Sequence, residues 1–149
     1  RQIGDGPIKK ELIEKVKKLN LNNVHFFDAI KKNQLQYVLT KCDFGLSKFE
    51  DKPVFKWGVS PNKIYDYMAA GLPIIIGLNN DNHIIQTSNS GFVIQNDYLV
   101  KFPEILNSLN DEDFEKMSHN SRKLAENNFS WESHSDRLLT ELKSLEKED

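Results

Sequence analysis

The chain has 149 residues, of which 38% are hydrophobic and 28% are charged, and its formal net charge is −2. This length and apolar content predict one domain with a single core, and the weak negative charge gives no reason to expect a nucleic acid partner. No apolar run approaches the ~18 residues that indicate a membrane span, and the single Cys42 cannot form an internal disulfide, so we expect a cytoplasmic protein without a signal peptide.

Strands and helices are predicted to alternate from the start of the chain. A strand ends at Gly4, and a glycine-rich turn then leads into a helix whose apolar residues recur at helical spacing. We expect a helix over 7–19, a strand over 24–27, a helix over 33–42 and a strand over 43–47. The connection over 48–59 is longer than the ~2–6 residues usual between a strand and a helix, which predicts that it lines a site.

Residues 60–77 carry the clearest local signals. Ser60 can cap a helix that begins at Pro61, because its hydroxyl accepts from free backbone N–H groups. This helix should run to about Ala70, where Gly71 suits the left-handed position that ends a helix. The β-branched run that begins at Pro73 and ends at Gly77 is typical of a buried strand.

The rest of the chain is mainly helical. We expect a short helix over 84–88, a strand over 92–94, and helices that begin near Tyr98, at Asp111 and after Ser130. Pro103 fits its helix only in a first turn. The apolar residues of the last helix should form a packing surface, and they are Trp131, His134, Leu138, Leu142 and Leu145.

This alternation predicts an α/β fold, a doubly wound Rossmann-like parallel sheet with helices on both faces and a helical tail over 111–149. Ligands bind such sheets at the carboxyl ends of the strands. The turn over 4–6, the long connection and the start of the helix at Pro61 all follow strand ends, so we expect them to meet at one crevice. The free N–H groups of that helix could hold a phosphate, and Asp66 lies one turn further in, on the face of Asn62.

Residues 60–76 resemble the signature of family 4 glycosyltransferases of the GT-B fold. That signature reads Glu, seven residues, Glu, then Ala-Met-Ala-x-Gly-x-Pro-Val-Val; Asp66 stands at the second glutamate and residues 67–73 follow in step. Residues 1–7 look like the family's earlier strand and turn, Ile-x-Gly-x-Gly-Pro. The first glutamate would fall at Gly58 and is absent, a variant that resembles bacterial surface-polysaccharide transferases.

The resemblance implies that residues 1–149 are the nucleotide-sugar-binding C-terminal domain of a retaining, hexosyltransferase-type enzyme without a metal or other cofactor. The donor would be a nucleotide-diphosphate sugar. The acceptor would be a glycan or lipid-linked glycan of a capsule, O-antigen or exopolysaccharide, which suits the inner face of the membrane. The family's preceding strand and helix, with an Arg and a Lys for the diphosphate, are missing, as is the N-terminal acceptor domain of the same polypeptide. We therefore expect the chain alone to be inactive.

The resemblance also assigns donor contacts. Asp66 would accept hydrogen bonds from the ribose hydroxyls, although it could equally pair with Lys63 or Asn62 as an ordinary helix carboxylate. The Ser60 hydroxyl and the backbone of Asn62, Lys63 and Ile64 would contact the diphosphate, with Lys63 adding a charge.

Other candidates are less specific. Gly4 and Gly6 would line the crevice and give clearance, but any tight turn before a helix prefers glycine. His83 lies near the position of a glutamate that contacts the donor sugar in relatives. The catalytic residue is unassigned; the loop residues that could replace the lost glutamate are Glu50, Asp51, Lys52, Lys56 and Trp57.

Two other functions fit the same motifs. One is a nucleotide-sugar epimerase of GT-B architecture, although an acid/base pair for such chemistry is not evident. The other is a non-catalytic nucleotide-binding or assembly domain, which the missing glutamate keeps open. A receiver-type signalling domain fits less well, because the early strand end lacks an acidic cluster.

Overall fold

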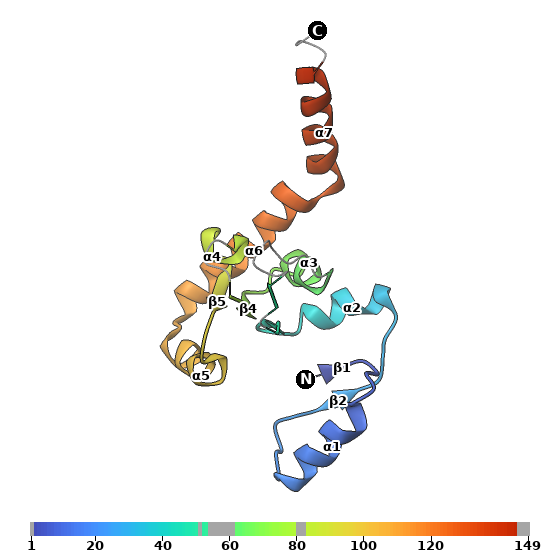
Figure 1. The fold of residues 1–149 in the computed structure, drawn as a ribbon, viewed down its shortest axis with the longest axis vertical. Helices are drawn as coiled ribbons and strands as arrows, with labels where there is room; N and C mark the ends of the chain where they lie inside the picture. Colours follow the sequence, from blue (N-terminus) through green and yellow to red (C-terminus); the bar gives the residue numbers. More distant parts are fainter. Residues whose placement is uncertain (1, 51, 54–61, 80–82, 146–149) are drawn as a thin grey trace. The chain divides into compact units, whose positions relative to one another are not determined.

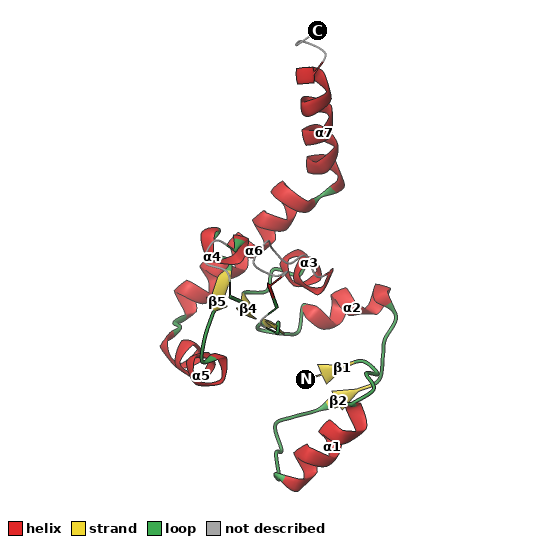
Figure 2. Cartoon of the chain, in the orientation of Figure 1, coloured by secondary structure: helices red, strands yellow, loops and turns green. Residues whose placement is uncertain are grey.

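A computed structural model describes residues 2–50, 52–53, 62–79 and 83–145 (Figure 1). The chain divides into two compact units, Arg1–Val38 and Leu39–Asp149, which we describe separately. Both contain parallel strands and helices (Figure 2), so the predicted α/β class is confirmed.

The first unit is a parallel strand pair with one helix between the strands. β1 (Gln2–Ile3) pairs with β2 (Phe26–Phe27), and α1 (Lys9–Lys18) connects them. The helix has no fully buried residue, although its predicted apolar face is half-buried at Leu12 and Val16. α2 (Lys32–Leu39) follows and reaches the second unit.

The second unit is built on a three-stranded parallel sheet in the order β3-β4-β5. β3 (Gly45–Lys48) and β5 (Gly91–Ile94) flank β4 (Ile74–Gly77), all four residues of which are buried. The helices of this unit are α3 (Asn62–Ala69), α4 (Ile84–Thr87), α5 (Tyr98–Ser108), α6 (Asp111–Phe129) and α7 (Trp131–Leu145).

Helices cover both faces of this sheet, as predicted. Gly45 has no side chain, and a Cβ there would lie 2.4 Å from the ring of Tyr67 in α3. Gly77 lies on the opposite face, where a Cβ would lie 2.8 Å from the ring of Tyr98 in α5. The core on the α3 face consists of Ile64, Met68, Ile74, Ile76, Leu78, Ile85 and Leu124. Burial of each such side chain contributes about 1.5–3 kcal/mol relative to exposure.

The end of α3 is tightly specified. Gly71 has φ +70°, its N–H donates to the Met68 carbonyl, and the Leu72 N–H donates to the Tyr67 carbonyl, which is the Schellman pattern. The sequence predicted this glycine cap.

Side chains of α6 bind the same turn. Ser118 Oγ donates to the Gly71 carbonyl at 2.6 Å, and Ser121 Oγ donates to the Leu72 carbonyl at 2.7 Å. Arg122 also donates to the carbonyl of Ala69. These bonds satisfy carbonyls that a helix end leaves without partners, and they hold α3 against α6.

One expectation for the helical part differs from the structure. Pro103 lies inside α5, beyond its first turn, so that expectation was wrong. The carbonyl that loses its hydrogen bond belongs to Leu99, which is 80% exposed, so water can replace the missing donor.

Ser130 caps α7 as expected, since its hydroxyl accepts a hydrogen bond from the Ser133 N–H at 3.1 Å. The apolar residues of α7 are exposed, with Trp131 at 87%, so they are available as a packing surface.

Gly91→Ala should destabilise the second unit by about 3 kcal/mol or more, because a Cβ there would lie 1.9 Å from the Ile74 carbonyl oxygen of the neighbouring strand. Urea unfolding measures the loss. Ser47→Ala in the same sheet is the contrast. The Ser47 hydroxyl is buried and has no hydrogen-bond partner in the described part of the chain, so its removal should leave stability unchanged or raise it by about 1 kcal/mol. Equal destabilisation by both changes would contradict the described packing.

Candidate functional site

The first turn of α3 lies at the carboxyl end of β3. Tyr67, near the end of α3, packs over Gly45 at the start of the strand. Lys63, in the first turn of α3, places its Nζ 5.8 Å from the ring centre of Phe49, the residue after the strand. The helix therefore runs antiparallel to the strand, and its free N–H groups and positive dipole end lie at the edge where α/β sheets bind ligands.

Asp66 is half-buried in α3, one turn after Asn62. Its carboxylate forms neither a hydrogen bond nor an ion pair with any other residue that the structure describes. The ordinary alternative, a pair with Lys63 or Asn62, is therefore not formed. A half-buried carboxylate without a partner retains all of its acceptor capacity for a ligand.

The other α3 candidates divide by exposure. Asn62 and Lys63 are exposed, whereas Ile64 is 3% exposed and belongs to the core. Ile64 can thus offer a ligand only its backbone. Ser60 and Gly58 lie outside the described residues, as do Asp51, Lys56 and Trp57; Glu50 and Lys52 form an ion pair with each other at 2.9 Å.

The turn at Gly4 and Gly6 belongs to the first unit. Gly4 has φ +135°, and apart from the adjacent residues no atom of the described chain lies within 4 Å of a Cβ built on either glycine, so the turn is open. Because the units are described separately, its predicted meeting with α3 remains a prediction.

Lys9 holds this turn, a role that the helical spacing of the apolar residues over 7–19 did not predict. Its Nζ donates to Asp5 at 2.8 Å, to Asp28 at 2.9 Å and to the Phe27 carbonyl at 3.0 Å. The hydrogen bond between Asp5 and Lys9 lowers the pKa of the carboxyl and raises that of the amine. The i,i+4 spacing of Asp5 and Lys9 was the available signal. Asp5 is thereby occupied, which agrees with its poor suitability as a phosphate ligand.

His83 is 7% exposed and caps α4. Its Nδ1 accepts a hydrogen bond from the Ile85 N–H at 3.3 Å, and burial lowers the pKa of the imidazole. The ring therefore has a structural partner, and its contact with a donor sugar remains a prediction.

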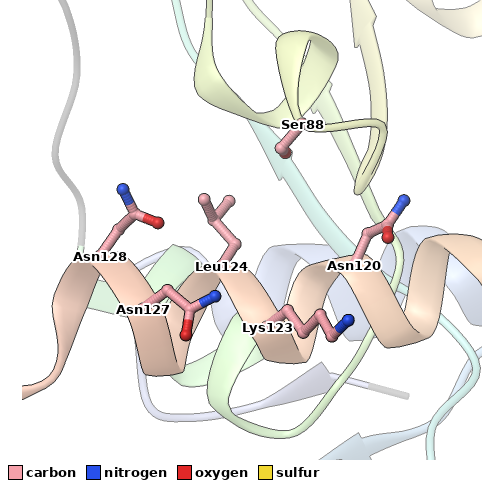
Figure 3. Close-up of a pocket in the computed structure, with 6 residues that line it drawn as sticks. All are labelled: Ser88, Asn120, Lys123, Leu124, Asn127 and Asn128. Carbon is pink, nitrogen blue, oxygen red and sulfur yellow. The ribbon is translucent and has the colours of Figure 1, made fainter.

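A small cavity lies at the opposite edge of the sheet (Figure 3). It has a volume of about 210 Å³, and it is lined by Ser88, Asn120, Lys123, Leu124, Asn127 and Asn128. Ser88 precedes the amino end of β5. Ligand pockets usually have at least ~300 Å³, so this hollow is too small and is misplaced for a nucleotide sugar.

Comparison with known families decides the relationship. The family described as glucosyltransferase 3-like, C-terminal domain, matches residues 9–130. The chain belongs to this family. It is therefore a glycosyltransferase-related domain, and the matched range includes both α3 and α6. No curated protein matches the chain.

Among the described residues of this glucosyltransferase 3-like domain, no three histidine, cysteine or carboxylate side chains form a group that could hold a metal ion. In the same part of the chain, no helix combines the length and hydrophobicity needed to cross a bilayer.

The free energy of unfolding should decrease as the pH falls below about 6.5, the ordinary pKa of a histidine side chain. Since the pKa of His83 is lower in the folded chain, the unfolded chain binds more protons there, and the protonated Nδ1 can no longer accept from Ile85. The midpoint of urea unfolding, measured between pH 7.5 and 5.5, tests this.

His83→Asn keeps a hydrogen-bond acceptor and should make the urea midpoint less dependent on pH, whereas His83→Ala should lower the free energy of unfolding by about 1 kcal/mol at pH 7.5. His119→Asn, at an exposed position of α6, is the control; an unchanged profile in His83→Asn would refute this role.

Proposed function

We propose that this domain binds the nucleotide-diphosphate sugar of a retaining glycosyltransferase with the GT-B fold, of the family 4 type. The observation that supports this most is the half-buried Asp66 one turn inside α3, which has no partner among the residues that the structure describes; the first turn of α3 lies at the carboxyl edge of the sheet. A carboxylate that accepts hydrogen bonds from ribose hydroxyls, next to a helix start that can hold phosphates, suits the ribose and the phosphates of a nucleoside diphosphate.

The diphosphate would receive its hydrogen bonds from the backbone of Asn62, Lys63 and Ile64, and from the Ser60 hydroxyl. Lys63 is exposed and forms no ion pair within the described residues, so its ammonium is available to a phosphate. As the sugar departs, negative charge grows on the leaving phosphate. Fixed N–H dipoles and a cation stabilise that charge without a metal.

The remaining parts of the proposal rest on the family resemblance. Gly4 and Gly6 would give the donor clearance, and His83 would lie near the sugar. A hexose would pass to a glycan or lipid-linked glycan acceptor held by an N-terminal domain of the same polypeptide, in the cytoplasm at the inner face of the membrane.

Asp66→Asn and Lys63→Gln should each weaken binding of a nucleoside diphosphate to the complete protein by about tenfold or more, since each removes a charged hydrogen-bonding group. Calorimetry with UDP and with GDP measures the affinity. Asp66→Asn should weaken binding of UMP and of UDP equally, because both contain the ribose. Lys63→Gln should weaken binding of UDP more than binding of UMP, because UDP has the additional phosphate.

Lys116→Gln removes an exposed charge from α6 and should leave both affinities unchanged. Absence of any nucleotide binding by the complete protein would favour a non-catalytic assembly domain. Conversion of a nucleotide sugar to its epimer without an acceptor would favour the epimerase.

A further inference from the structure

Lys48 is the last residue of β3, and its side chain crosses the neighbouring strand at the carboxyl edge of the sheet. The register pairs Lys48 with Gly77, and a Cβ on Gly77 would lie 3.0 Å from Lys48 Cγ. The aliphatic part of the lysine therefore occupies the space that a side chain at position 77 would fill.

The charged end of this side chain lies over an aromatic ring. Lys48 Nζ lies 6.0 Å from the ring centre of Tyr98, the first residue of α5, within the range of cation–π attraction. Tyr98 in turn stacks on Phe102, with ring centres 5.9 Å apart and an interplanar angle of 19°. Gly77 allows this arrangement, because a Cβ there would also lie 2.8 Å from the Tyr98 ring.

Lys48 and Lys63 approach the end of β3 from opposite faces of the sheet. Lys63 lies over Phe49 on the α3 side, and Lys48 lies over Tyr98 on the α5 side. The Phe49 N–H donates to the Gly77 carbonyl at 2.9 Å, so the backbone between the two lysines is fixed as well. Neither ammonium forms an ion pair with another described residue. The ion pairs in the described part of the chain join Lys9 to Asp5 and Asp28, Lys52 to Glu50, and Arg122 to Glu126.

We propose that Lys48, placed by Tyr98 over Gly77, is a second cationic binding residue for the pyrophosphate of the donor, together with Lys63. This rests on the proposed donor site at the start of α3. A pyrophosphate carries more charge than one lysine neutralises, and without a metal a second cation on the other side of the edge shares that charge. Tyr98 is a positioning residue, because it acts through the lysine.

Lys48→Gln should weaken binding of UDP or GDP to the complete protein by about tenfold, while the matching monophosphate weakens less. The affinity for the diphosphate should also lose part of its salt dependence, because one ion contact is gone. Lys101→Gln, an exposed lysine of α5, is the matched control for net charge and should bind like the unaltered protein.

Tyr98→Ala should weaken diphosphate binding in the same direction as Lys48→Gln, and Tyr98→Phe should restore it because the ring is kept. The double variant Lys48→Gln, Tyr98→Ala should bind the diphosphate only slightly more weakly than Tyr98→Ala alone, because both changes remove the same contact. If the ring were purely structural, the two losses of affinity would add. If the unaltered protein binds a diphosphate and Lys63→Gln weakens it while Lys48→Gln does not, this inference is wrong and the proposed function stands. If the unaltered protein binds no diphosphate, the proposed function fails first.

Discussion

The structure depends on the contact between α6 and the turn that ends α3. The hydroxyls of Ser118 and Ser121 donate to the carbonyls of Gly71 and Leu72, and Ser121 is fully buried. Carbonyls at a buried helix end need such partners, so this turn has one favourable position on α6. Met68 is fully buried in the core and Tyr67 packs over Gly45, so the rest of the helix is fixed between α6 and the sheet. The first turn of α3 is thereby fixed at the carboxyl edge.

This arrangement leaves some polar groups free and occupies others. The carboxylate of Asp66 and the ammonium of Lys63 have no ion-pair partner among the described residues, whereas Asp5 and Lys9 bond to each other and His83 caps α4. A chain with a net charge of −2 thus presents at one sheet edge two cations, Lys48 and Lys63, that form no ion pair with another described residue. Local placement, not the overall charge, determines which ligand such an edge attracts.

Local chemistry allowed much of the second unit to be predicted from the sequence. The helix expected from Pro61 to about Ala70 is observed as Asn62–Ala69, and Gly71 ends it in the left-handed conformation. The β-branched run after Pro73 forms the fully buried β4. These features arise from residues close in sequence, where capping and backbone preference decide the outcome.

Contacts between distant residues were not predictable in the same way. The bonds from α6 to α3 join residues 47 and 49 positions apart, and the approach of Lys48 to Tyr98 depends on the pairing of β3 with β4. The tolerance of Pro103 inside α5 depends on the exposure of Leu99, which one sequence does not reveal. For the site, the sequence predicted that Asp66 lies on the face of α3 shared with Asn62, but it could not show that the carboxylate stays unpaired among the described residues.

The most direct test is a crystal structure of the complete protein with a bound nucleoside diphosphate, UDP or GDP. We expect phosphate oxygens within hydrogen-bonding distance of the backbone N–H groups of residues 62–64, and hydrogen bonds from the ribose hydroxyls to the Asp66 carboxylate. A nucleotide bound away from the start of α3, or a ribose that does not contact Asp66, would contradict it.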